Sequence, residues 1–422
     1  MSICQNNRSL KIKLKDILVL FTFLIFTGFF WKNEFRIGAL FVIALETGII
    51  IIKAKYSFFS VFAFLINYCF LMEYFVFSNR YVYGILSLNY VKIYYFEMFI
   101  CCSAFNLILI VFIDVMNIAK KEKNIYGTQF NISKNATTIY CIIAIIITFL
   151  IFPFFPTDFY FTNSRFSGGI IPFSGWSCIP FFFVAISILG RKKRRTVYFT
   201  ALFIIFWYVL HGERVEAMGL IVFIIVWLYN TVKISRQKKI EIAGIGLTSI
   251  LCLTAVGIIR VGGNMSLKQL VTNIFVQTTA CDVTNVFNCA VDLYKKSGGY
   301  HGTTYLSYLI NCIPYRDDQY QFSRQLISDG YRSAGGGHFL AEPYANGGIL
   351  IVIIEIIILM SVLYYLIKKN SLYRTLIYVE LFLAVFRIAW YGLNYMIVTI
   401  LYFVPFSIFI NKILQMKQKI EL

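Results

Sequence analysis

Charged residues are scarce in this sequence. Only 14% of its 422 residues are Asp, Glu, Lys or Arg, whereas 59% are hydrophobic, with 43 Phe and 29 Tyr among them. A water-soluble core cannot enclose that much apolar surface. The sequence therefore predicts an all-α polytopic membrane protein, in which helices satisfy their own backbone groups inside the bilayer.

Several functional signatures are also missing. The three histidines and ten cysteines show no metal-ligand spacing, and most cysteines stand singly in apolar runs, which is typical of packing residues. No glycine-rich loop precedes a lysine, which argues against ATP hydrolysis. We therefore expect neither a metal nor another cofactor. No small-residue cleavage site follows the apolar run 17–30, so we expect an uncleaved first helix.

Basic residues outnumber acidic ones by 39 to 20, which gives a net charge of +19. Most of this charge lies in short clusters between apolar runs, where it orients a membrane protein and meets anionic lipid headgroups. We therefore do not expect nucleic-acid binding. The clusters expected on the cytoplasmic side are Lys11–Lys15, Lys53 with Lys55, Lys120–Lys123, Arg191–Arg195, Lys233–Lys239, Lys368 with Lys369, and Lys412–Lys419.

Two apolar spans fit between each successive pair of clusters, so we expect about 12 transmembrane helices and cytoplasmic termini. The whole chain, 1–422, is then one integral membrane domain, with 260–345 a large extracytoplasmic loop between the ninth and tenth spans. The segment 79–93 is polar and short, and it is either interfacial, re-entrant or a further span that would invert every later helix. The expected spans are 17–31, 36–52, 57–77, 94–116, 138–155, 172–189, 196–210, 214–231, 241–259, 346–367, 372–390 and 394–411.

Arginine and lysine are distributed differently in this topology. Most lysines fall on the inner side, but nine of the 15 arginines fall at or near the outer side, where positive charge is normally rare. A guanidinium binds phosphate in a fork that lysine cannot copy, which favours an anionic ligand such as a lipid diphosphate. The alternative is pairing with headgroups or with loop acids such as Asp317 and Asp318. The nine are Arg36, Arg80, Arg165, Arg214, Arg260, Arg316, Arg324, Arg332 and Arg387.

Two outer segments carry candidate site residues. The turn His211-Gly212-Glu213-Arg214-Val215-Glu216 places four ionisable residues at a helix hairpin, where they need each other, water or a ligand, unless the turn is simply solvated. The second segment, GGGHFLAEPYANGG, contains His338 and Glu342. Pro343 favours a helix start there, and Glu342 would then either stabilise a helix terminus or act as a base.

Three acids fall inside expected spans, namely Glu46, Glu355 and Glu380. An intramembrane carboxyl is a functional candidate by default. Pairing with Arg374, Arg387 or backbone groups is the alternative for each.

These residues resemble a known family. The large outer loop, the Gly212-Glu213-Arg214 turn, Tyr300-His301-Gly302-Thr303-Thr304-Tyr305 followed by Ile313-Pro314, and the stretch from Gly335 to Gly348 are similar to the bacterial oligosaccharide repeat-unit polymerases of O-antigen and capsule synthesis, the Wzy type. The resemblance covers the whole chain in topology, but in residues only the turn and roughly 300–348.

The resemblance implies a metal-independent glycosyltransferase of the bacterial inner membrane. Its partners would be undecaprenyl-diphosphate-linked oligosaccharides, membrane lipids and a candidate chain-length regulator protein. The expected catalytic residues are Arg214 and, as base, Glu342 or His338. The arginines expected to hold the diphosphate with Arg214 are Arg165, Arg260, Arg316, Arg324 and Arg332.

Three other functions stay open. An O-antigen ligase uses the same lipid-diphosphate donor but transfers glycan to lipid A core, and only the motifs favour the polymerase over it. A transporter of lipid-linked sugars suits twelve spans, but we find no internal repeat and no matching pair of broken helices. A structural or sensor protein would need no cluster of outward arginines.

Overall fold

The computed structural model describes residues 36–72, 94–127, 132–156, 169–171, 175–190, 195–232, 235–262, 278–313, 318–331, 336–369 and 371–420. Within these ranges it contains 16 α-helices and no β-strand, so the predicted all-α class is confirmed there. The chain forms two compact units. The first comprises residues up to 122 with 279–304 and 322–368, and the second comprises 123–278, 305–321 and 369 onward.

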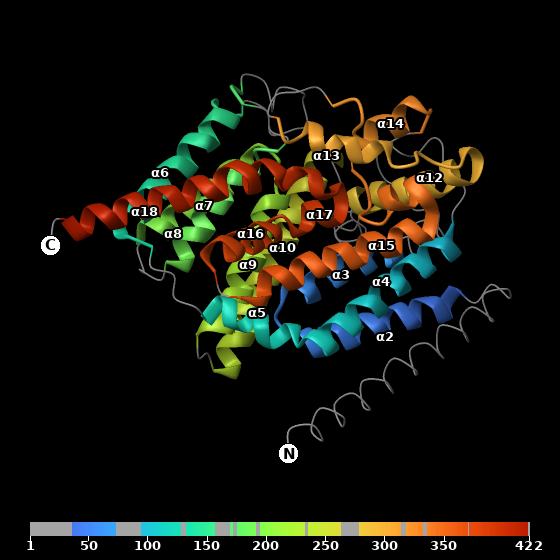
Figure 1. Ribbon diagram of the computed structural model, residues 1–422, viewed down its shortest axis with the longest axis horizontal. Coiled ribbons are helices and arrows are strands. Elements are labelled where there is room, and N and C mark those ends of the chain that lie inside the picture. Colours follow the sequence, from blue (N-terminus) through green and yellow to red (C-terminus); the bar gives the residue numbers. More distant parts are fainter. Residues whose placement is uncertain are drawn as a thin grey trace, which may run out of the picture. The chain divides into compact units, whose positions relative to one another are not determined.

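In the first unit, α2 packs against α3 and α4, and α15 packs along α4, as Figure 1 shows in blue, cyan and orange. Two further helices, α12 and α14, come from the polar segment that precedes α15. The helices of this unit are α2 (Arg36–Ala54), α3 (Phe58–Met72), α4 (Tyr95–Met116), α12 (Thr278–Ser297), α14 (Phe322–Ser328) and α15 (Ala341–Lys368).

A polar network joins α2, α3 and α4 inside their apolar packing. Glu46 is fully buried, and one of its carboxylate oxygens accepts hydrogen bonds from Asn106 Nδ2 at 2.9 Å and Ser103 Oγ at 3.2 Å. Asn106 and Asn67 exchange hydrogen bonds, and Asn67 also donates to Thr47 Oγ1 at 2.7 Å. Among the described residues, the hydrogen-bond partners of Glu46 are therefore amide and hydroxyl groups.

Helix α12 is fastened to its neighbours through Asp292. Its carboxylate accepts hydrogen bonds from the hydroxyls of Tyr94 at 2.7 Å and Tyr331 at 2.8 Å, and it pairs with Lys296 at 2.6 Å. Burial acts to raise the pKa of Asp292, but these three donors outweigh it and the pKa lies below its ordinary value. One carboxylate thus ties α12 to the start of α4 and to Tyr331, three residues after α14.

Helix α15 is interrupted near its start. Gly347 and Gly348 depart from helical geometry, and Gly348 has a φ of 65°, which favours glycine. A Cβ atom on Gly348 would also lie 3.0 Å from the Tyr294 ring. The helix therefore begins before the predicted start at Pro343 or Asn346. A short helical segment begins at Ala341, and the long apolar part follows the glycines.

In the second unit, α6 packs against α7 and α8, while α9 packs against α10, α16 and α17. The α-helices here are α6 (Lys134–Ile151), α7 (Ile179–Leu189), α8 (Arg195–Leu210), α9 (Val215–Thr231), α10 (Arg236–Gly262), α13 (Leu306–Ile310), α16 (Leu372–Leu383), α17 (Val385–Tyr391) and α18 (Val404–Ile420). A 3-10 helix, η4 (Leu393–Met396), and a π-helix, η5 (Thr399–Phe403), connect α17 to α18. Helices α5 (Ile118–Gly127) and η3 (Thr303–Tyr305) each begin in the first unit and end in the second.

Local sequence explains several of these boundaries. Ser133 caps α6 by accepting the Ala136 N–H at 3.0 Å, and Ser371 caps α16 by accepting the Arg374 N–H at 3.3 Å. Pro180 lies in the first turn of α7, where its missing N–H costs no helical hydrogen bond.

Four described helical segments are long and apolar enough to cross a membrane: Tyr95–Met116, Lys134–Ile151, Ala341–Lys368 and Leu393–Met416. Shorter apolar helices cover Phe58–Leu71, Ile179–Leu189, Arg195–Leu210 and Val215–Thr231. Together they make the chain a multi-pass membrane protein. The span predicted at 372–390 is two helices that meet at Ala384. The span predicted at 17–31 and the segment 79–93 lie outside the described residues.

We predict that Gly219→Ala destabilises the protein, because the added Cβ would lie 2.0 Å from the Leu383 carbonyl oxygen where α9 meets α16. Overpacking of this kind costs about 1–3 kcal/mol. Thermal unfolding in detergent micelles measures it. Gly244→Ala in α10 is the matched control, since nothing lies within 4 Å of its added Cβ; equal melting temperatures for the two variants would contradict the close contact.

Candidate functional site

The Gly212-Glu213-Arg214 turn is the C-terminus of α8. The Gly212 N–H bonds to the Val209 carbonyl at 2.9 Å, and the Glu213 N–H bonds to the Tyr208 carbonyl at 2.9 Å. Gly212 has a φ of 79°. This pair of bonds around a left-handed glycine is a Schellman motif, which ends one helix and lets the next begin within two residues. Arg214 accordingly occupies the position before the first residue of α9.

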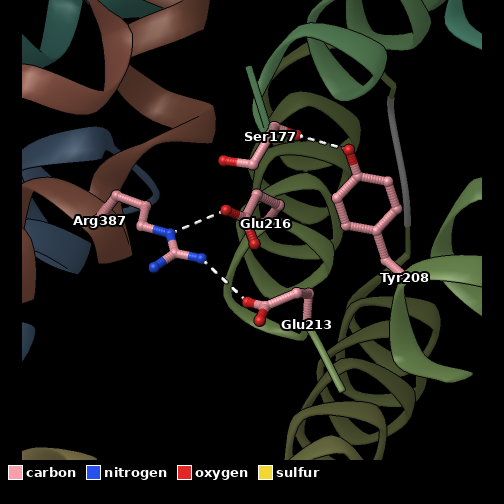
Figure 2. A network of polar contacts seen from close by, with 5 residues as sticks. All are labelled: Ser177, Tyr208, Glu213, Glu216 and Arg387. Atoms are coloured by element: carbon pink, nitrogen blue, oxygen red, sulfur yellow. Dashed lines mark hydrogen bonds and ion pairs between the residues drawn. The ribbon is translucent and has the colours of Figure 1, made fainter. Parts of the chain in front are cut away.

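Arg387 from α17 holds both glutamates of this turn (Figure 2). Its Nε donates to Glu216 Oε1 at 2.8 Å, and its Nη2 donates to Glu213 Oε2 at 3.1 Å. Tyr208 lies beside them and donates its hydroxyl to the Ser177 carbonyl at 3.0 Å. We call Glu213, Glu216 and Arg387 the buried triad.

The triad is almost completely removed from solvent, with Arg387 5%, Glu213 8% and Glu216 2% exposed. Charges are retained at such a depth only when they are paired and hydrogen bonded. Glu216 also lies in the first turn of α9, where a negative charge interacts favourably with the helix dipole. The rings of Tyr391 and Tyr395 lie 4.7 and 5.1 Å from the guanidinium carbon and add cation–π contacts.

The Arg214 side chain contacts a different helix from the one that binds Glu213 and Glu216. Its Nη1 lies 3.1 Å from the carbonyl oxygen of Thr254 and 3.5 Å from that of Leu253, both in α10. Its side chain is partly exposed. An arginine from outside the turn thus binds both acids, and Arg214 reaches α10.

In the first unit, the segment Tyr300–Thr304 is docked onto the start of α15. The Tyr300 N–H bonds to the Ala345 carbonyl at 2.8 Å, and the Gly302 N–H bonds to Asn346 Oδ1 at 2.8 Å. Asn346 Nδ2 in turn donates to Thr304 Oγ1 at 2.7 Å and to the Glu342 carbonyl at 2.8 Å. Two motifs that lie more than forty residues apart in the sequence therefore form one structure.

His338 and Glu342 are both buried in this region. His338 Nδ1 accepts the Leu340 N–H at 3.1 Å, so the ring proton is on Nε2, which lies 3.4 Å from the Ile66 carbonyl oxygen. Burial lowers the pKa of His338 to about 4, which makes the ring neutral at physiological pH. Glu342 lies in the first turn of α15, the helix-terminus position that the sequence allowed for it.

Of the other arginines predicted to hold the diphosphate, Arg324 is an exposed residue of α14. Arg260 lies near the end of α10, with its side chain outside the described part. Arg165, Arg316 and Arg332 lie outside the described residues. Of the loop acids, Asp318 accepts hydrogen bonds from Ser307, Asn311 and the Tyr320 N–H.

The structure thus brings His338 and Glu342 into one unit and places Arg214 in the other. The role of Arg387 as partner of the turn was missed. An arginine inside the apolar run 372–390 was the available signal, since an intramembrane charge requires a partner. Among the described residues, no three His, Cys, Asp or Glu side chains come together as metal ligands.

No protein-family model, curated protein or solved structure matches this chain. The chemistry of the residues around Arg214 and at the start of α15 therefore carries the functional assignment.

We predict that Arg387→Met destabilises the protein by about 3–5 kcal/mol, because two buried carboxylates lose their cation. The triple variant Glu213→Gln, Glu216→Gln, Arg387→Met should recover most of that loss, since no unpaired charge is left. Unfolding in detergent, followed by the loss of helical circular dichroism, measures both. A single variant as stable as wild type would show that Arg387 does not balance these acids.

We also predict that His338 makes the protein acid-sensitive. Because its folded pKa is depressed from 6.5 to about 4, its contribution is complete above pH 6.5 and is lost as pH falls toward 4. The shift corresponds to about 3 kcal/mol. Unfolding of wild type and His338→Asn should be compared at pH 7.5 and 4.5. The same pH dependence in both proteins would contradict a buried, neutral His338.

Proposed function

We propose that this protein is an oligosaccharide repeat-unit polymerase of a bacterial inner membrane. It transfers a growing glycan from its undecaprenyl diphosphate carrier to the non-reducing end of a new lipid-linked repeat unit. The proposal includes about twelve spans, both termini in the cytoplasm, and the segment 260–345 on the opposite side of the membrane, where the flipped repeat unit is available.

The observation that carries this proposal is the arrangement around Arg214. Arg387 takes both carboxylates of the turn, and the Schellman motif fixes the backbone from which the Arg214 side chain departs. The contacts of Arg214 include two backbone carbonyl oxygens, which leave its formal charge intact. A turn held in this way presents a guanidinium at a defined position.

The proposed reaction needs such a group. When the glycosidic bond to the carrier breaks, negative charge develops on the diphosphate, and a pre-positioned guanidinium stabilises that charge in the transition state. A forked donor also binds two phosphate oxygens at once, which an ammonium cannot do. The second requirement is a base for the acceptor hydroxyl, for which the sequence offers Glu342 and His338.

The triad explains the family-like Gly-Glu-Arg sequence in physical terms. Gly212 allows the left-handed backbone, Glu213 pairs with Arg387, and Arg214 binds the ligand. Arginine in the last position is therefore chemically specific, whereas the first two residues maintain the geometry.

We predict that Arg214→Lys lowers polymerisation by about 100-fold at unchanged protein level, because the charge stays but the fork is lost. A host strain deleted for this gene is complemented with wild type, with Arg214→Lys, or with Arg195→Lys. Arg195 is the matched control, an exposed arginine at the opposite end of α8. A lipopolysaccharide gel gives the result.

Loss of the ladder with core bearing one repeat unit retained is expected for the deletion and for Arg214→Lys. Full-length ladders with Arg214→Lys would contradict the diphosphate role. If the deletion instead leaves polymer on the carrier lipid and core without glycan, the protein is a ligase.

A further inference from the structure

The three histidines differ in what their ring nitrogens contact. Both nitrogens of His338 meet backbone groups, as described above. In buried His211, Nδ1 lies 2.8 Å from the Trp207 carbonyl oxygen and Nε2 lies 2.9 Å from that of Phe154. His301 is exposed, and within the described part of the chain its ring has no hydrogen bond, ion pair or ring contact. Of the three imidazoles, only that of His301 therefore has its nitrogens available to a substrate.

His301 also has an unfavourable backbone conformation. The Thr303 N–H bonds to the Tyr300 carbonyl at 3.0 Å and closes a four-residue turn, in which His301 has a φ of 51° and Gly302 a φ of 89°. Positive φ at both central positions is the type I′ pattern, for which Asn-Gly is the preferred sequence. A residue other than glycine is uncommon in the left-handed region, and residues in such sparsely populated regions concentrate at functional sites.

The turn is held on a buried support. Asn346 contacts it on one side through the Gly302 N–H and Thr304 Oγ1, and contacts the Glu342 carbonyl on the other. A Cβ atom on Gly299 would lie 2.1 Å from the Ala345 carbonyl oxygen, so the two backbones meet without an intervening side chain. The backbone that carries His301 is therefore fixed at the start of α15.

Glu342 is buried, and three other carboxylates of the surrounding segments already bind other side chains. Asp292 is held by two tyrosines and a lysine, as described for α12. Asp329 accepts the Tyr300 hydroxyl at 2.6 Å, and Glu97 pairs with Lys295. An acid already engaged in this way is a poorer proton acceptor than an open imidazole, which is the commonest general base in enzymes.

We propose that His301 accepts the proton of the acceptor hydroxyl during glycan transfer, an inference that rests on the function proposed above. The acceptor oxygen forms a bond to the anomeric carbon of the donor while the bond from that carbon to the carrier diphosphate breaks. The diphosphate leaves with the bonding electron pair. The hydroxyl proton passes to a ring nitrogen of His301 and then to water.

The decisive variant is His301→Asn, because it removes the imidazole and creates the Asn-Gly pair that the turn prefers. Purified protein in vesicles is given the lipid-diphosphate-linked repeat unit extracted from the deletion strain. We expect kcat to fall by about 100-fold with KM nearly unchanged, and the melting temperature to equal or exceed that of wild type. Ser328→Ala, at an exposed position of α14 in the same unit, should keep its activity.

Chemical rescue adds a readout that a structural role would not change. Added imidazole should restore part of the activity of His301→Gly and leave wild type unaffected. Wild-type activity in His301→Asn, or a lower melting temperature that accompanies its loss of activity, would overturn the assignment. If wild type itself does not elongate the repeat unit, the proposed polymerase function fails, and the role of His301 fails with it.

Discussion

The ion pairs from Arg387 to Glu213 and Glu216 are the interaction on which the second unit depends. Two carboxylates at the start of α9 could not remain in an apolar helical interior without this guanidinium, and the guanidinium could not remain without them. The pairing joins α17 to the α8–α9 turn, at distances of 3.1 and 2.8 Å. Arg387 thus binds both acids of the turn, and Arg214 extends toward α10.

In the first unit, hydrogen bonds attach polar segments to helices whose surfaces are largely apolar. A few side chains make most of these connections. Asp292 fastens α12, while Asn346 fastens the turn that carries His301. Each connection joins residues distant in sequence, so the polar segment has a defined shape next to the membrane helices. A rigid turn of this kind can hold a reactive side chain in one position.

Much of the fold could be predicted from the sequence, and much less of the site. Apolar runs separated by basic clusters located α4 and α8 within a few residues, because length and composition decide where such helices form. The break inside α15 was missed, since a glycine pair is compatible with both a helix and a kink. The partner of Glu213 was missed because Arg387 is 174 residues away and no spacing rule connects them. His301 lay inside a motif noted in the sequence, but only its φ of 51° and its open ring distinguish it from His338.

We propose that this membrane protein extends a lipid-linked glycan. The most direct measurement is mass spectrometry of the products formed when purified wild-type protein in vesicles receives one lipid-diphosphate-linked repeat unit. A polymerase should give a series of lipid-linked glycans that differ by whole repeat units, with one undecaprenyl diphosphate released for each addition. Unchanged substrate, or glycan transferred only to added lipid A core, would contradict it.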